Sequence, residues 1–135
     1  AVEAALGKRE SVSVFSDDFD TPDGTGVRDY IHVTDLAAAH LLALEALIAE
    51  PERSHLLNCG YGRGFSVLEV LDAVDRATNN PIKRVMTGRR AGDPGKLISD
   101  NSAILRTFPW TPRHADLDQI VAHALAWERQ LGDRA

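Results

Sequence analysis

Segments with clear helix-start and helix-stop residues alternate with short apolar runs, and this alternation constrains the fold more than any other feature of the chain. The expected helices run from Thr34 or Asp35 to Ala49, from Ser66 to Asn79 and from Asp116 to Gly132, with a shorter one after Asp100. The expected strands are Ser11–Phe15, Val27–Val33, His55–Cys59 and Ile82–Thr87. Strands and helices interspersed in this way predict the α/β class.

Two of the helices begin with side chains that can accept hydrogen bonds from free backbone N–H groups. Ser66 is followed three residues later by Glu69, which completes a capping box. Asp116 stands in the same relation to Gln119. The apolar residues after each cap recur at helical spacing, so each helix is expected to bury one face.

The composition is that of an ordinary globular domain. The chain has 135 residues, 44% of them hydrophobic, and a formal charge of −5. This length predicts one domain over residues 1–135, and the mild acidity argues against nucleic acid as a partner. The single cysteine, Cys59, excludes an internal disulfide and fits a reducing, cytoplasmic compartment. No apolar run has transmembrane length, so no membrane partner is expected.

The first residues, Ala1 to Gly7, are typical of the last turn of a helix, with Gly7 just beyond its end. No helix-start residue precedes them. We therefore expect the chain to be part of a longer protein.

The sequence shows no motif for a metal site or a serine nucleophile. The five histidines have neither H-x-x-x-H nor H-E-x-x-H spacing, and no G-x-S-x-G segment occurs. No bound metal is expected, and Cys59 is interpreted as a small buried residue.

Two glycine-containing loops could meet a phosphate, and each has a plainer interpretation. Gly60–Gly64 lies between a strand and a helix, but its glycine spacing favours a tight turn over a dinucleotide loop. Gly88–Pro94 combines Arg89 and Arg90 with Asp93. A guanidinium group suits phosphate oxygens and a carboxylate suits sugar hydroxyls, so this loop either binds such a ligand or is simply exposed.

The segment Val27–Asp35 places polar groups on an expected strand. Alternation puts Arg28, Tyr30 and His32 on one face, which could be turned toward a ligand or toward solvent. Asp29 lies on the opposite, apolar face and would need a polar partner if it were buried.

The same segment closely resembles a known family. Residues 23–37 read D-G-T-G-V-R-D-Y-I-H-V-T-D-L-A and are similar to the UDP-glucose 4-epimerases, members of the extended short-chain dehydrogenase/reductase superfamily. The resemblance continues through residues 57–67, 89–94, 110–112 and 126–128, and so covers nearly the whole chain. The first block is specific to the 4-epimerases, whereas the later blocks are shared with other nucleotide-sugar enzymes.

The resemblance implies an isomerase that interconverts UDP-galactose and UDP-glucose through a 4-keto intermediate. The family binds NAD on an N-terminal Rossmann domain and uses a Tyr-x-x-x-Lys pair, whereas neither Tyr30 nor Tyr61 has a lysine four residues on. The chain thus resembles only the C-terminal, substrate-binding portion, a small mixed α/β domain without the Rossmann domain. No catalytic residue is expected in it, and NAD is expected to bind the missing domain.

The resemblance also implies which residues bind UDP. Arg28 and Arg90 match the two arginines that hold the pyrophosphate, and Asp93 matches a residue near the ribose hydroxyls. The strand beside the uracil would supply Ser13, Val14 and Phe15, and the neighbouring pocket wall would supply Tyr30 and Val67.

Leu97 stands where the family lines the sugar end of the pocket. Relatives with a tyrosine there tend to exclude N-acetylated hexoses, and relatives with a small residue admit them. Leucine has intermediate volume, which predicts a preference for UDP-glucose and UDP-galactose with some activity on UDP-N-acetylglucosamine. The alternative is that Leu97 packs into the core beside Ile98.

Other functions remain open at this point, namely a stand-alone UDP-sugar-binding module, or part of a dehydratase or decarboxylase that acts on a nucleotide sugar. The expected partners are a UDP-hexose and the missing Rossmann domain. Without that domain, the helix from Asp35 and the strand His55–Cys59 should expose apolar surface, so self-association is expected.

Overall fold

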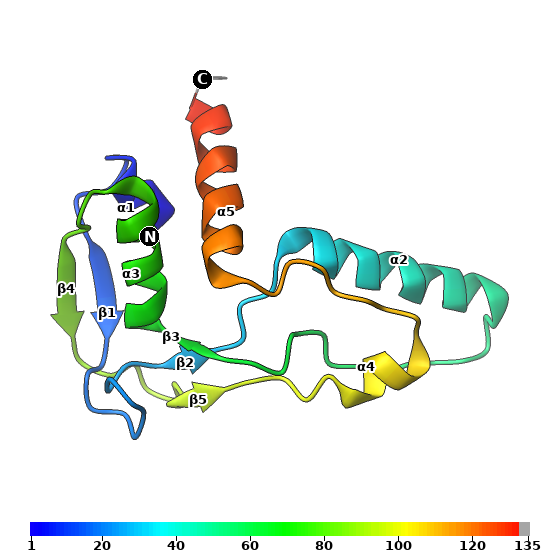
Figure 1. The fold of residues 1–135 in the computed structure, drawn as a ribbon. Helices are drawn as coiled ribbons and strands as arrows, with labels where there is room; N and C mark the ends of the chain where they lie inside the picture. Colours follow the sequence, from blue (N-terminus) through cyan, green and yellow to red (C-terminus); the bar gives the residue numbers. More distant parts are fainter. Residues whose placement is uncertain (133–135) are drawn as a thin grey trace.

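The computed structural model describes residues 1–132, which form two lobes joined by a small sheet (Figure 1). The helices are α1 (Val2–Ala5), α2 (Val33–Ala49), α3 (Val67–Thr78), α4 (Ser102–Thr107) and α5 (Leu117–Gly132). The strands are β1 (Val12–Phe15), β2 (Val27–Arg28), β3 (Phe65–Ser66), β4 (Arg84–Thr87) and β5 (Lys96–Leu97). The mixture confirms the α/β prediction.

The first lobe is built on the parallel pair of β1 and β4, in which Val14 lies opposite Met86. Helix α3 provides the crossover and packs against α5, with α1 beside them (Figure 1). We call the buried side chains of this lobe the first core. Its members are Val14, Phe65, Leu71, Ala73, Val74, Ile82, Leu117, Val121 and Leu125.

The second lobe contains α2 and α4, and α2 extends away from the first lobe (Figure 1). Its buried side chains form a separate and smaller second core of Ala39, Ile104, Phe108 and Trp110. The indole N–H of Trp110 donates to the backbone carbonyl of Asp35 at 3.0 Å, which ties the connecting segment to the first turn of α2.

The three-stranded sheet lies between the lobes. Strand β2 is central, antiparallel to β3 and parallel to β5. This register sets Arg28 directly opposite Leu97, so two residues 69 positions apart become neighbours on adjacent strands. The sheet is short, but it determines where the two expected ligand-binding residues meet.

The expected helix caps are present. The Ser66 hydroxyl accepts from the backbone N–H of Glu69 at 3.0 Å, and the Glu69 carboxylate accepts from the backbone N–H of Ser66 at 2.7 Å. Asp116 accepts from the backbone N–H of Gln119 at 2.8 Å. Asn79 ends α3 in the left-handed conformation, with φ of +49°. These local signals therefore placed both helices correctly.

Two strand predictions are wrong. Only Val27 and Arg28 of the segment to Val33 form a strand, and His32 rather than Thr34 or Asp35 caps α2. His55–Cys59 forms no strand in the described part of the chain, and the side chain of Leu56 is 99% exposed. An extended segment becomes a strand only when another strand pairs with it, and the described residues place none beside this one.

Apolar side chains on α2 are left exposed, as expected from the sequence. They are Val33, Leu41, Leu44, Leu47 and Ile48. Among the residues that the structure describes, no helix is both long and apolar enough to cross a bilayer.

Candidate functional site

Arg28 and Arg90 converge on the carboxylate of Asp93. The Arg28 Nη2 atom lies 3.0 Å from Asp93 Oδ1, and Arg90 donates through Nε and Nη2 to Oδ2 at 3.1 and 2.9 Å. The two guanidinium groups, Arg90 first, hold the pKa of the Asp93 carboxyl below its usual value. The cluster therefore carries two positive charges and one negative charge, and a net positive charge suits an anionic ligand.

Aromatic rings stand beside these charges. The Arg90 guanidinium lies over the ring of Phe15, with 4.3 Å between the guanidinium carbon and the ring centroid. The adjacent Arg89 lies over Phe19 at the same distance. Phe15 is the last residue of β1, and Arg90 belongs to the loop of residues 88–94. Their contact joins this strand to that loop, although 75 positions separate the two residues. A planar ring next to two cations is an arrangement that a nucleotide can use for its base and its phosphates.

Leu97 lies next to Arg28 and is 60% exposed, so it is not a core residue. Together with Arg28, Asp29 and Ser99 it lines a cavity of about 350 Å³. This position excludes the interpretation in which Leu97 packs inside the core, and it places the side chain beside the arginine cluster.

The remaining residues expected at the site differ in how much of each is exposed. Ser13 is exposed, whereas Tyr30 and Val67 are half-buried against the first core. The side chain of Val14 is 0% exposed, so only its backbone could meet a ligand. Its role in the fold is to fill the first core beneath β1.

Asp29 organises the loop beside the cluster, a role that the sequence did not specify. Its carboxylate accepts from the backbone N–H groups of Tyr61 and Gly62 at 3.0 and 2.9 Å and from the Ser99 hydroxyl at 2.9 Å. The sequence had indicated only that Asp29 needs a partner if it is buried. The structure shows that these bonds tie the loop after Cys59 to the segment after Leu97.

Asp35 is a second anchoring carboxylate and is only 4% exposed. It accepts from the Tyr61 hydroxyl at 2.7 Å and from the backbone N–H groups of Arg113 and His114 at 3.0 and 2.8 Å. Burial and the bond to Asp35 raise the pKa of Tyr61 to about 12. Tyr61 is therefore a structural hydroxyl group and remains protonated at neutral pH.

The glycine run Gly60–Gly64 forms a turn, as favoured from its spacing. A Cβ on Gly60 would lie 2.1 Å from the Ser99 hydroxyl and 2.6 Å from an Asp29 oxygen. A Cβ on Gly64 would clash with Val27. Neighbouring side chains approach the backbone too closely for any residue larger than glycine at these two positions, as a tight turn requires.

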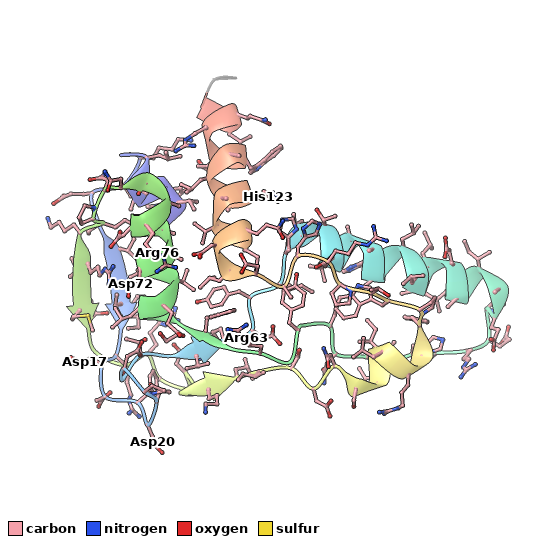
Figure 2. The ribbon with its side chains drawn as sticks, viewed as in Figure 1. Asp17, Asp20, Arg63, Asp72, Arg76 and His123 are labelled. Carbon is pink, nitrogen blue, oxygen red and sulfur yellow. The ribbon has the colours of Figure 1, made fainter. Side chains whose placement is uncertain are left out.

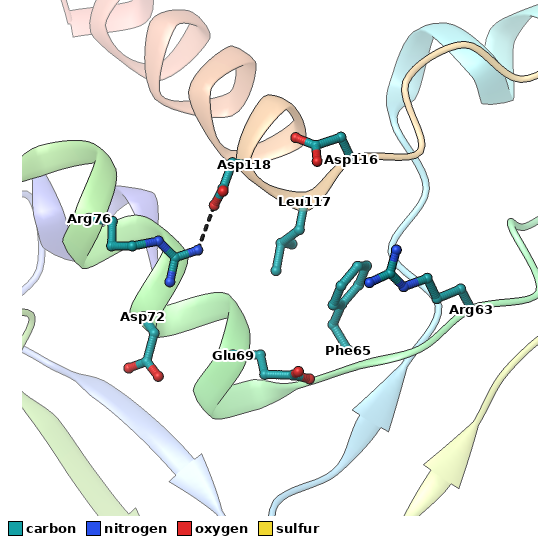
Figure 3. A pocket seen from close by; sticks show the side chains of 8 residues that line it. All are labelled: Arg63, Phe65, Glu69, Asp72, Arg76, Asp116, Leu117 and Asp118. Carbon is teal, nitrogen blue, oxygen red and sulfur yellow. Dashed lines mark hydrogen bonds and ion pairs between the residues drawn. The ribbon is translucent and has the colours of Figure 1, made fainter.

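A separate polar cavity of about 290 Å³ opens between α3 and α5 (Figure 3). Three of its charged side chains are already paired, since Arg76 contacts Asp118 at 2.6 Å and Asp72 contacts Arg84 at 2.8 Å. The Glu69 carboxylate is used in the helix cap. The Arg76–Asp118 ion pair therefore links α3 to α5 across this cavity, and we interpret the cavity as part of the contact between the two helices.

Sequence reasoning did not foresee that His32, His114 and His123 come together. Their ligating atoms all lie within 4.8 Å of one another, and Figure 2 shows His123 on the side of α5 that faces α2. His32 is buried and lies beyond the end of β2, so it does not share one face of a strand with Arg28 and is not turned toward solvent. The wide spacing of the three residues along the chain gave no signal for this cluster.

Comparison with known proteins shows which family the chain is similar to. Residues 1–60 match the model of the NAD dependent epimerase/dehydratase family. A UDP-glucose 4-epimerase of Azospirillum brasilense is 47% identical over 131 residues, which are 97% of this chain and 37% of that relative.

Solved structures of UDP-glucose 4-epimerases also match nearly all of this chain over only part of their own length. The UDP-glucose-4-epimerase of Stenotrophomonas maltophila, with bound NAD and formylated UDP-arabinopyranose, is 42% identical with a TM-score of 0.90, over 99% of this chain and 39% of that one. The UDP-Glc/GlcNAc 4-epimerase of Campylobacter jejuni is 46% identical with a TM-score of 0.83, over 96% and 39%. The chain thus spans about two-fifths of the length of these relatives. It belongs to the family of the UDP-glucose 4-epimerases, as the counterpart of their C-terminal portion.

Proposed function

We propose that residues 1–135 form the UDP-sugar-binding portion of a UDP-glucose 4-epimerase, with a UDP-hexose as ligand. The observation that carries this proposal is the convergence of Arg28 and Arg90 on the Asp93 carboxylate, with the Arg90 guanidinium over the ring of Phe15. Two guanidinium groups match the two negative charges of a diphosphate. A UDP-linked sugar in the Stenotrophomonas relative supports the choice of nucleotide.

In this proposal each of these residues contacts a different part of the UDP-sugar. Arg28 and Arg90 would hold the diphosphate, Asp93 the ribose hydroxyls, and Phe15 the uracil. Val67 and Tyr30 would close the wall of the pocket, and the backbone of Ser13 and Val14 would face the base. Tight binding of UDP leaves the hexose free to turn and positions its reacting carbon, which is how binding far from the reaction contributes to rate.

Catalytic groups belong, in this proposal, to the part of the protein that the chain does not cover. The relatives are more than twice as long as this chain, and the Stenotrophomonas structure contains NAD. NAD would supply hydride transfer at the sugar, and a Tyr-x-x-x-Lys pair would supply acid/base chemistry. Tyr61 does not fit the second role, because a catalytic tyrosine needs a lowered pKa and Asp35 acts in the opposite direction.

The test compares the purified 135-residue chain with the full-length protein. We expect the full-length protein to interconvert UDP-galactose and UDP-glucose, and the 135-residue chain to show no activity and only weak UDP binding in calorimetry. Epimerisation by the 135-residue chain alone would contradict the assignment, and a full-length protein that dehydrates or decarboxylates UDP-sugars would move it to another enzyme of the superfamily.

We further propose that the rest of the protein, a Rossmann domain, covers the apolar side of α2 and pairs with residues 55–59. The exposed stripe of α2 and the unpaired extended segment around Leu56 support this, because burial of such groups is favourable and their exposure promotes association. The 135-residue chain should therefore self-associate in sedimentation experiments at micromolar concentration. Leu44→Glu with Ile48→Glu should reduce the association, whereas Leu131→Glu on α5 should leave it unchanged; a monomeric wild-type chain would contradict this.

Leu97 should set the tolerance for the sugar. Leu97→Tyr adds a ring beside Arg28, and added atoms in a packed site cost about 1–3 kcal/mol. In the full-length protein we expect this variant to lose activity on UDP-N-acetylglucosamine and largely to keep activity on UDP-galactose. Lys96→Tyr is the matched control, because adjacent strand residues point to opposite faces. An unchanged kcat/KM ratio between the two sugars in Leu97→Tyr would reject this role.

A further inference from the structure

The three histidines gather where the two cores meet. His32 immediately precedes α2 and is 5% exposed, His114 lies in the segment before α5, and His123 lies on α5 (Figure 2). The rings of His32 and His114 stack with centroids 4.5 Å apart, and His123 meets His32 edge-on at 5.0 Å. Helix α5 packs on the first lobe through α3 and α1, whereas α2 belongs to the second lobe. The contact between His32 and His123 therefore joins the two lobes.

The hydrogen bonds determine where the ring protons are. The backbone N–H of Thr34 donates to His32 Nδ1 at 3.0 Å, and a backbone N–H can only donate. His32 Nδ1 is therefore unprotonated, and the ring proton is on Nε2. His32 Nε2 lies 2.8 Å from His123 Nδ1, so His32 donates and His123 accepts. Both rings are neutral in this arrangement, with the His123 proton on Nε2.

The same hydrogen bonds argue against a metal at this cluster. A histidine bound to a metal through Nε2 normally donates from Nδ1 to a neighbouring acceptor, but His32 Nδ1 accepts from Thr34. Two nitrogen ligands at tetrahedral zinc would stand about 3.3 Å apart, given Zn–N bonds of about 2.0–2.1 Å. The 2.8 Å between His32 and His123 is a hydrogen-bond distance.

A second proton on either ring would break a bond. On His32, the new proton would sit on Nδ1 and point at the Thr34 N–H, which removes the cap of α2. On His123, the new proton would sit on Nδ1 and point at the Nε2 proton of His32, so that two donors would face each other. Both bonds, Thr34–His32 and His32–His123, are therefore present together only while both rings are neutral.

The surroundings favour the neutral form of His32. Its charged and titratable neighbours are Asp35 on α2, Tyr61 in the loop beside it, His114 in the connecting segment and His123 on α5. Burial, followed by the imidazoles of His114 and His123, lowers the pKa of His32 below its ordinary 6.5, against the opposing effect of Asp35. The Asp35 carboxylate already accepts from Tyr61 and from two backbone N–H groups.

We propose that the hydrogen-bonded series Thr34–His32–His123 is a proton-sensitive connection between the two lobes: both bonds are present when both rings are neutral, and one added proton breaks one of them, the Thr34–His32 bond if it binds His32 and the His32–His123 bond if it binds His123. Arg28 lies four residues before His32 on the same connecting segment. Loosening of the contact at acid pH would thus release the segment that carries one of the arginines of the candidate site, without any change to the arginine itself.

The sign of the stability change follows from linkage. Because His32 binds its proton less readily in the folded than in the unfolded chain, the unfolded chain holds more protons below pH 6.5. The contribution of the Thr34–His32–His123 arrangement to stability is therefore complete above pH 6.5. It falls as the pH decreases from 6.5 toward the lowered folded-state value.

Histidine ¹⁵N NMR spectra of the full-length protein test the proposal directly. At pH 7.5 we expect His32 to show protonated Nε2 and unprotonated Nδ1, and on acidification to titrate below 6.5. Protonated Nδ1 at neutral pH, or titration of His32 at or above 6.5, would overturn the proposal. Zinc at pH 7.5 should leave the three ring signals unchanged, and a joint shift of all three would replace the proposal with a metal site.

Two variants separate protonation from packing. His123→Asn places an oxygen where His123 has Nδ1, so it still accepts from His32 but cannot take a proton. His32→Asn keeps an acceptor for the Thr34 N–H, and Asn is a favourable cap. We expect the fall in the urea midpoint between pH 7 and pH 5.5 to be reduced in each variant and most in the double variant, relative to wild type. Identical pH profiles for wild type and double variant would overturn the proposal, and the NMR titration of the wild type decides the matter if the variants do not fold.

Discussion

Arg28→Ala in the full-length protein should weaken UDP binding by about 2–5 kcal/mol, the range for truncating one partner of a desolvated charge pair. Its side chain is 26% exposed and shares Asp93 with Arg90, so its removal also leaves the Asp93 carboxylate with a single cation. Arg90→Ala should fall in the lower part of this range, because the Arg90 side chain is more exposed and solvent screens its charge.

Calorimetry with two ligands makes this prediction specific. UDP affinity should fall in both variants, whereas uridine, which lacks the phosphates, should bind each variant as it binds the wild type. Arg53→Ala provides the matched control, since Arg53 is an exposed arginine paired with Glu50 just after α2. Equal UDP affinity in wild type and both variants would show that the phosphates bind elsewhere.

Asp35→Ala should have the largest effect on stability, a loss of about 3 kcal/mol or more in the free energy of unfolding. The substitution leaves the Tyr61 hydroxyl and the N–H groups of Arg113 and His114 without their acceptor at a buried position. Urea denaturation of the full-length protein measures this loss. Asp20→Ala, at an exposed aspartate (Figure 2), should change the free energy by no more than about 0.5 kcal/mol.

Asp35→Asn should lose less than Asp35→Ala, because the amide oxygen still accepts. The pH dependence gives a second check. Burial works to raise the pKa of Asp35, but hydrogen bonds from Tyr61, Arg113 and His114 outweigh it and hold the pKa below 3.8. The stabilisation from Asp35 is therefore present above pH 3.8 and is lost as the pH falls below it. An Asp35→Ala variant as stable as wild type at pH 7 would show that this carboxylate does not anchor the segment.

Local sequence signals predicted the helices well. Ser66 and Glu69 form a reciprocal cap within one turn, so this helix start depends on residues only three positions apart. Asp116 gave the start of α5 for the same reason. The resemblance carried by residues 23–37 identified the family from the sequence, because that motif is specific to the 4-epimerases, and the comparisons confirmed it.

Strands were harder to predict because they depend on partners. Residues 55–59 have the composition of a strand, yet nothing in the described part of the chain pairs with them. Conversely, β5 became a strand only because β2 lies beside it, and its two residues carry no strand signal of their own. A strand is a property of two segments, whereas a capped helix is largely a property of one.

The sequence by itself determined the α/β class, the starts of α3 and α5 and the family, because each of these depends on residues close together in the chain. Only the tertiary structure decided that Arg28 and Arg90 meet at Asp93, that Arg90 lies over Phe15, that Leu97 lies opposite Arg28, and that His32 bonds to His123. The contacts of Arg28 with Asp93 and Leu97, of Arg90 with Phe15 and of His32 with His123 join residues from 65 to 91 positions apart. Their geometry is set by the packing of β2 between β3 and β5 and of α5 on α3, and no local pattern encodes how those elements meet.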